Sequence, residues 1–165
     1  MREVILTSYL FDGYPTALEG FRILAELVNT SSPEKLEFEY SPENVTLWRR
    51  RGELLCRQIY GSQYESLIAR VERIAPELAD AMLVEGYGKV LARDQLPIQA
   101  RELCIVAILA AKCKPRQLLS HALGALRLGA SPEQLLNVLE SAIECAPTRN
   151  IERAREIIKE AIDKF

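Results

Sequence analysis

The chain has 165 residues, 48% of them apolar, and a chain of this size buries roughly 70% of the surface that its unfolded form exposes, enough for one core. Its 21 basic and 23 acidic residues give a net charge of -2 without long blocks of one sign, which argues against nucleic acid as a partner. No apolar run has membrane-spanning length and the first residues lack a secretion signal, so we expect a single-domain cytoplasmic protein without membrane contact.

Helical periodicity dominates the first sixty residues. Pro15 opens a segment whose apolar residues share one face, and Ser41 with Pro42 opens a second, in which Gly52 is a candidate break. Residues 36–40 alternate between apolar and polar types, but no partner strand is in view, so an extended connector is expected there. The amino-terminal region, residues 1–50, is therefore expected to be helical.

Residues 62–111 predict two outer helices and one central helix. Ser62 with Glu65 has the spacing of a capping box before an amphipathic stretch, and Pro76 begins another such stretch. From Leu103 to Ala111, nine apolar residues follow one another. This pattern is typical of a helix in the middle of a bundle or at a subunit interface.

The central helix is expected to form a hairpin with the helix that follows it. Pro115 cannot continue the first helix, so the chain turns there and a new helix runs to Gly129. Ser131 with Pro132 starts a further helix, and Pro147 precedes a last amphipathic one. The sequence thus predicts an all-α, single-domain helical bundle of about eight helices with a central helical hairpin.

Two side chains on the predicted hairpin could form an acid/base couple. Glu102 directly precedes the apolar run, where a carboxylate is costly unless paired, and His121 is followed by the small residues Gly124 and Ala125. Small residues let a neighbouring helix approach or leave room for a ligand. Glu102 lies thirteen residues before Pro115 and His121 six after it, so contact needs a lopsided turn or a subunit neighbour. If the two meet, the carboxylate orients an imidazole that can act near neutral pH; the alternative is a solvated glutamate and a histidine that only packs.

The cysteines and a run of arginines provide further candidates. Four cysteines without a Cys-x-x-Cys pair, and a single histidine, disfavour structural zinc and a disulfide framework, so no metal is expected. Cys113 lies between Lys112 and Lys114, which favour its thiolate, although simple packing is the alternative. Arg51 ends a run of three arginines that could bind the carboxylates of a small acid through paired hydrogen bonds, or could be a solvated helix face.

Three motifs stand in the second half of the chain: Gly86-Tyr-Gly-Lys-Val-Leu-Ala-Arg93-Asp-Gln-Leu96, Arg101-Glu102-Leu103, and His121-Ala-Leu-Gly124-Ala-Leu-Arg-Leu-Gly129. Together they resemble the carboxymuconolactone decarboxylase family, which includes the alkyl hydroperoxidase D-type proteins. The resemblance covers residues 60–150, whereas residues 1–50 match less well. It implies an all-helical fold that assembles into trimers or hexamers.

The resemblance also bears on the chemistry. In the hydroperoxidase branch a Cys-x-x-Cys pair lies between the glutamate and the histidine, at positions that hold Lys114 and Gln117 here. A dithiol peroxidase needs both thiols, so their absence favours the decarboxylase branch.

The decarboxylase branch implies the removal of carbon dioxide from a small unsaturated carboxylated lactone, with no cofactor. Conjugation to the ring carbonyl accepts the released electrons, and the protein binds the carboxylates and delivers a proton. His121 and Glu102 would then be catalytic, and Arg101 and Arg51 would bind the substrate. Two alternatives stay open: a thiol-dependent hydroperoxidase that uses Cys113, and a non-catalytic helical binding protein.

Overall fold

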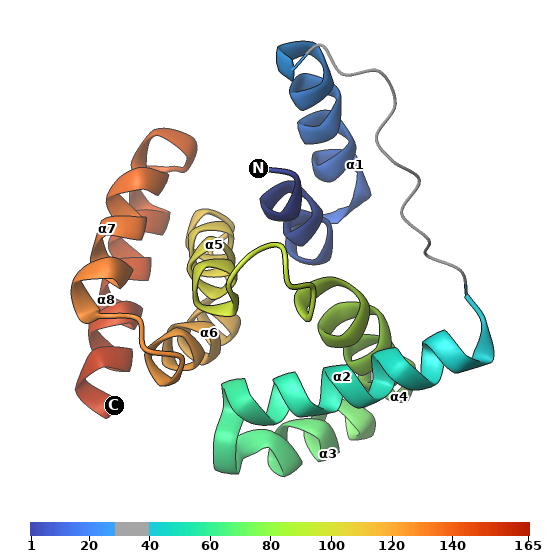
Figure 1. Ribbon diagram of the computed structural model, residues 1–165. Helices are drawn as coiled ribbons and strands as arrows, with labels where there is room; N and C mark the ends of the chain where they lie inside the picture. Colours follow the sequence, from blue (N-terminus) through green and yellow to red (C-terminus); the bar gives the residue numbers. More distant parts are fainter. Residues whose placement is uncertain (29–39) are drawn as a thin grey trace.

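The computed structural model describes residues 1–28 and 40–165, and every regular element in these ranges is helical (Figure 1). The connector expected at residues 36–40 lies, apart from Tyr40, outside the described residues. The α-helices are α1 (Arg2–Val28), α2 (Pro42–Tyr60), α3 (Tyr64–Ile74), α4 (Pro76–Ala81), α5 (Ile98–Ala111), α6 (Pro115–Arg127), α7 (Pro132–Ala142) and α8 (Thr148–Lys164). Two short 3-10 turns, η1 (Gly61–Gln63) and η3 (Ile143–Cys145), and a π-helical segment, η2 (Met82–Leu91), complete the described part. The predicted all-α class is confirmed.

Most helix starts follow the local signals in the sequence. Ser41 caps α2 with Pro42 in its first turn, and Ser131 starts α7 as expected and forms a capping box with Gln134. The capping box predicted at Ser62 is absent. Gly61, with a φ of 56°, ends α2, and η1 runs directly into α3, so Ser62 lies inside the 3-10 turn and Gln63 occupies the cap position.

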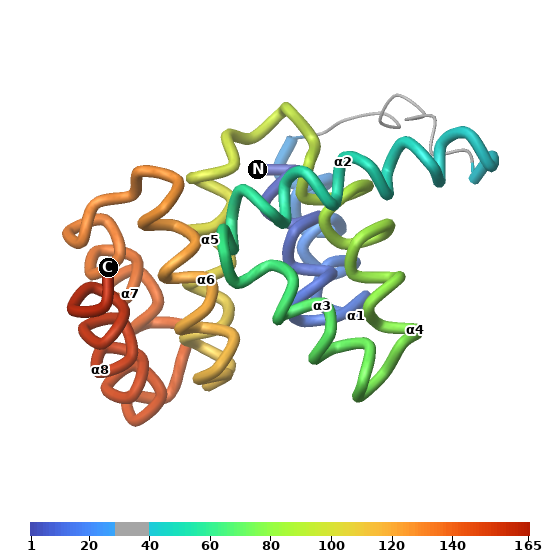
Figure 2. The backbone as a smooth tube through the Cα atoms, turned by 90° about the horizontal axis from the view of Figure 1, so that it is seen from below, coloured from blue at the N-terminus to red at the C-terminus, as the bar shows by residue number. Residues whose placement is uncertain are grey.

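The α5–α6 hairpin lies at the centre of the fold. In Figures 1 and 2 it stands between the α7–α8 pair and the group formed by α2 and η2, and α1 packs against α5. The predicted apolar helix α5 is therefore surrounded by α1, α6, α7 and α8 of the same chain. Fully buried aliphatic residues from several helices form the centre of this core: Ile59, Ile105, Val106, Leu118, Leu135, Leu139 and Ile158.

Helix α2 and segment η2 pack with almost no side chain between them. A Cβ atom at Gly52 would collide with the carbonyl oxygen of Leu83, and one at Gly88 would collide with the carbonyl oxygen of Trp48. Gly52 was a candidate break, but α2 runs through it without interruption. The glycine serves instead to bring two backbones into contact, and this contact fixes α2 beside η2.

Helix α1 is bent at Gly13, whose φ of 85° and ψ of 171° lie outside the helical region. The bend separates residues 2–12, which pack on the core with half-buried side chains, from residues 14–28, which leave Leu18 and Leu27 exposed. The sequence indicated only the helix after Pro15. Among the helices of residues 1–28 and 40–165, none combines the length and apolarity needed to cross a bilayer.

Candidate active site

The hairpin brings Glu102 and His121 into contact. Nδ1 of His121 and Oε2 of Glu102 are 2.8 Å apart, and the two residues are 5% and 0% exposed. Counted to the ends of the helices, Glu102 lies nine residues before Ala111 and His121 six after Pro115, a difference of less than one helical turn. The reach of a glutamate side chain covers this offset, so the contact forms within one chain.

Aromatic rings from two other helices flank the imidazole. The ring of Phe11, on α1, stands edge-on to it at 88° with a centroid distance of 5.3 Å, and the ring of Tyr60, on α2, lies at 6.3 Å. The Tyr60 hydroxyl is 2.6 Å from the hydroxyl of Tyr87 on η2. Burial raises the pKa of both tyrosines above its ordinary value, so both stay neutral hydroxyl groups at physiological pH.

Gly124 lies one helical turn after His121 and makes room for α2. A Cβ atom there would lie 2.6 Å from Cγ2 of Ile59 and 3.3 Å from Oε2 of Glu102. Of the two roles predicted for the small residues after His121, the structure shows the close approach of a neighbouring helix. The same approach seals one side of the Glu102 carboxylate.

Each member of the pair keeps one polar atom without a partner among the described residues. Oε1 of Glu102 is buried and accepts no hydrogen bond, and no described group pairs with Nε2 of His121. An unpaired buried oxygen is rare and points to a bound water or ligand. When Glu102 is ionised it can only accept, so Nδ1 carries a proton and Nε2 is the nitrogen left to exchange one with a substrate.

The cysteines do not add a thiol centre to this pair. All four are free, and Cys113 is exposed on the turn between α5 and α6, whereas His121 is buried six residues into α6. Cys56 is buried, and its burial together with the negative charge of Glu102 raises the pKa of its thiol to about 12. The thiol therefore stays protonated. Among the described residues, no three His, Cys, Asp or Glu side chains gather in a way that could hold a metal ion.

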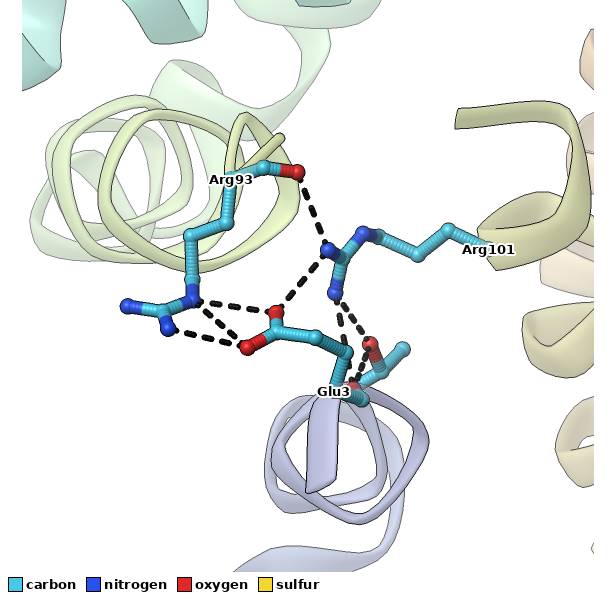
Figure 3. Close-up of polar contacts among 4 residues, drawn as sticks. Glu3, Arg93 and Arg101 are labelled. Atoms are coloured by element: carbon cyan, nitrogen blue, oxygen red, sulfur yellow. Dashed lines mark hydrogen bonds and ion pairs between the residues drawn. The ribbon is translucent and has the colours of Figure 1, made fainter. Parts of the chain in front are cut away.

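Arg101 precedes Glu102 in the chain but reaches toward α1 (Figure 3). It is fully buried, and its Nη2 donates to Oε2 of Glu3 at 3.0 Å while its Nη1 donates to Oγ1 of Thr7 at 2.9 Å. Arg93 donates to the same Glu3 carboxylate through Nε and Nη2. Both amino groups of Arg101 are thus engaged in holding α1, which leaves neither for the carboxylate of a substrate in this arrangement.

Arg51, the other arginine considered for substrate, is exposed on a separate groove. This groove, of about 710 Å³, lies between α2 and residues 88–98 and is also lined by Gln58 and Asp94. A second groove, of about 770 Å³, is lined by both halves of α1 and by Arg93. Neither groove has His121 or Glu102 in its lining, so the structure brings the predicted acid/base pair together but not the predicted arginines.

Several neighbours of the site were not predicted from the sequence, among them Glu3, Phe11 and Tyr60. Tyr60 is the last residue of the buried face of α2. A tyrosine hydroxyl on a buried face needs a polar partner, and this requirement is a signal in the sequence that could have marked Tyr60. No comparable local signal marks Glu3, because its partner Arg101 is 98 residues away.

Comparison with known proteins finds a family that matches the part of the chain carrying this site. Residues 76–160, which include the whole α5–α6 hairpin and both members of the pair, match the carboxymuconolactone decarboxylase family. One curated relative is Peroxisomal protein 2 of Schizosaccharomyces pombe, 25% identical over 146 residues that make up 87% of this chain and 67% of the relative. The resemblance found in the sequence is thus confirmed: the chain belongs to the carboxymuconolactone decarboxylase family.

Proposed function

We propose that the protein is a cofactor-free lyase that decarboxylates a small unsaturated carboxylated lactone, with His121 as the acid. One observation carries the proposal: a buried imidazole is held at Nδ1 by a carboxylate 2.8 Å away, while its Nε2 has no partner among the described residues. The reaction class is supported by membership of the carboxymuconolactone decarboxylase family. The thiol alternative has less support, since Cys113 lies on an exposed turn outside the pair.

The reaction follows from the two partners. The bond between the ring carbon and the carboxylate carbon breaks, carbon dioxide leaves, and the electron pair moves through the conjugated system onto the lactone carbonyl oxygen. His121, protonated on both nitrogens, then donates the Nε2 proton to a ring carbon, and the electrons return from the oxygen to form the new C–H bond. Glu102 stabilises the imidazolium before the transfer and fixes the ring, and solvent later restores the proton.

The Tyr60–Tyr87 pair adds a neutral donor. Two hydroxyl groups share one hydrogen bond, so one of their two hydrogens is left to donate. A neutral donor in a dry site stabilises the negative oxygen of a dienolate more strongly than it would in water. In the proposed reaction this hydrogen serves the lactone carbonyl oxygen.

The test is release of carbon dioxide from unsaturated lactones that carry a ring carboxylate. Wild-type protein should release it, and His121→Ala should be slower by about 10²–10⁴-fold, the usual contribution of general acid catalysis. Glu102→Gln keeps the shape of the side chain but removes its charge, and should be slower too. The matched control is Glu144→Gln, at an exposed glutamate of η3, which should keep full activity.

Three outcomes would count against the proposal. Full activity in His121→Ala would refute the role of the imidazole, and no release from any such lactone would refute the reaction. Consumption of an organic hydroperoxide that disappears in Cys113→Ser would support the peroxidase alternative instead.

We also propose self-association as a trimer or hexamer, in line with the family resemblance. The apolar side chains on the second half of α1, Leu18, Ile23, Leu27 and Val28, support it because about half or more of each is left uncovered by the described residues. For location we keep the cytoplasm as the proposal. The name of the Schizosaccharomyces pombe relative provides the peroxisome as the alternative, and microscopy of a fluorescent fusion separates the two.

A further inference from the structure

The imidazole of His121 is only 5% exposed, so little room is left for a molecule to approach Nε2. Two rings cover it, Tyr60 and Phe11. Tyr60 is 8% exposed, belongs to α2 and is hydrogen-bonded to Tyr87. Phe11 is only partly buried and belongs to the first half of α1. The cover that can move with least disturbance of the core is therefore the segment that carries Phe11.

The amino-terminal end of that segment is held by an ion-pair cluster (Figure 3). Glu3 lies between Arg93 and Arg101, with contacts of 2.9 Å and 3.0 Å. All three side chains are at least 88% buried, because their exposed fractions are 12%, 12% and 0%. One carboxylate thus pairs with two guanidinium groups that are largely buried.

The rest of residues 2–12 is attached by polar pairs and partly buried apolar groups. Asp12 pairs with Lys112 at 2.7 Å, and the hydroxyl of Tyr9 donates to Glu85 at 2.9 Å. Thr7 is the sole fully buried residue between positions 2 and 12. Partly exposed contacts of this kind hold a helix less firmly than a fully buried apolar face.

The carboxy-terminal end of the segment adjoins a non-helical residue, Gly13, that can serve as a joint. Gly13 adopts a φ of 85° with a ψ of 171°, a conformation that is open to glycine and strained for other residues. Rotation at this residue moves residues 2–12 without moving residues 14–28. The segment is thus bounded by the cluster at Glu3 on one side and by a glycine joint on the other.

From this arrangement we propose that residues 2–12 form a hinged lid over His121, latched by Glu3 and turning at Gly13. Loss of the Glu3 charge leaves Arg101 buried without a counter-ion, which is strongly unfavourable. Opening the lid relieves this cost because it lets water reach the guanidinium group. The lid governs access to Nε2 whatever reaction the pair performs, so the inference stands apart from the proposed function.

The single histidine of the chain makes the lid measurable without an activity assay. Diethyl pyrocarbonate acylates an accessible imidazole nitrogen, and the rate is followed by ultraviolet absorbance and mass spectrometry. Glu3→Gln should raise this rate constant tenfold or more. The matched control, Glu19→Gln, removes a carboxylate that is 67% exposed and pairs with Arg22 on the second half of α1, and should leave the rate unchanged. Added salt should raise the wild-type rate by less than Glu3→Gln does, since it weakens the partly exposed Asp12–Lys112 pair but hardly the buried pairs of Glu3.

Hydrogen exchange separates lid opening from unfolding of the whole chain. In Glu3→Gln the amides of residues 2–12 should lose protection while those of α8 keep theirs. The lid is refuted if His121 reacts within twofold of the wild-type rate, or if α8 loses protection in parallel with residues 2–12. If Glu3→Gln does not fold, Asp12→Asn loosens the lid by removing its pair with Lys112 beside the joint, and the same two measurements should show a smaller rise in rate and the same pattern of exchange.

Discussion

Gly124→Ala should destabilise the protein through one identifiable contact. The new Cβ would lie 2.6 Å from Cγ2 of Ile59, whose side chain is fully buried and branched at Cβ, so it cannot swing away. Overpacking of this kind costs about 1–3 kcal/mol. Replacing glycine inside a helix returns about 0.8–1.0 kcal/mol of helix propensity. The net loss should be about 0–2 kcal/mol in the free energy of unfolding, measured by urea denaturation with the fluorescence of Trp48.

A double-mutant cycle tests whether Ile59 is the cause. Ile59→Ala removes Cγ2, so adding Gly124→Ala in that background should stabilise the protein by about 1 kcal/mol, the helix propensity alone. The coupling between the two substitutions is then about 1–3 kcal/mol. Gly86→Ala is the control, because the only atom near its Cβ would be the carbonyl oxygen of Ala81 at 4.0 Å, and it should not destabilise. Strictly additive costs at positions 59 and 124 would refute the reasoning.

Three further predictions concern acid stability, thiols and assembly. Burial tends to raise the pKa of Glu3, but hydrogen bonds and charges from Arg93 and Arg101 outweigh it and lower the pKa below 4.5. Glu3 therefore stabilises the fold above pH 4.5, and this contribution is lost as the pH falls through the lowered pKa. Urea midpoints should fall less steeply below that pH in Glu3→Gln, and equal slopes would contradict this. Ellman's reagent should modify Cys113 in the native protein and Cys56 only after unfolding; rapid native reaction of Cys56 would show that the core is open. Light scattering should give three or six times the chain mass of 18.6 kDa, and the mass of a single chain would contradict the assembly.

The sequence predicted the helices well because their limits are set by neighbouring residues. Pro42, Pro115 and Ser131 mark helix starts in the structure, since a missing N–H or a side-chain cap acts within one turn. Ser62 failed as a cap because a 3-10 turn over residues 61–63 leads straight into α3 and places Gln63 at the cap position. The first half of α1 was included only in the general expectation of a helical region 1–50, and its start was not located, although Leu6 and Leu10 have helical spacing and pack on the core.

The candidate site was predicted only in part, because its residues are marked locally in the sequence but their contacts depend on how separate helices pack. Glu102 and His121 are marked by their positions on the hairpin, but whether they touch depends on how the two helices end at the turn. Arg101 was assigned to the substrate from the family resemblance alone. Its partner Glu3 lies on another helix, and only the packing of α1 on α5 brings the two together.

The Glu3–Arg101 pair also dictates an order of events during protein synthesis. The ribosome completes Glu3 98 residues before Arg101, which at 5–20 residues per second is an interval of about 5–20 s. Throughout it, the apolar side chains of residues 4–11 lack α5, the helix with which α1 makes most of its contacts. Residues 2–12 can therefore take their final place only after the first turn of α5 has left the exit tunnel.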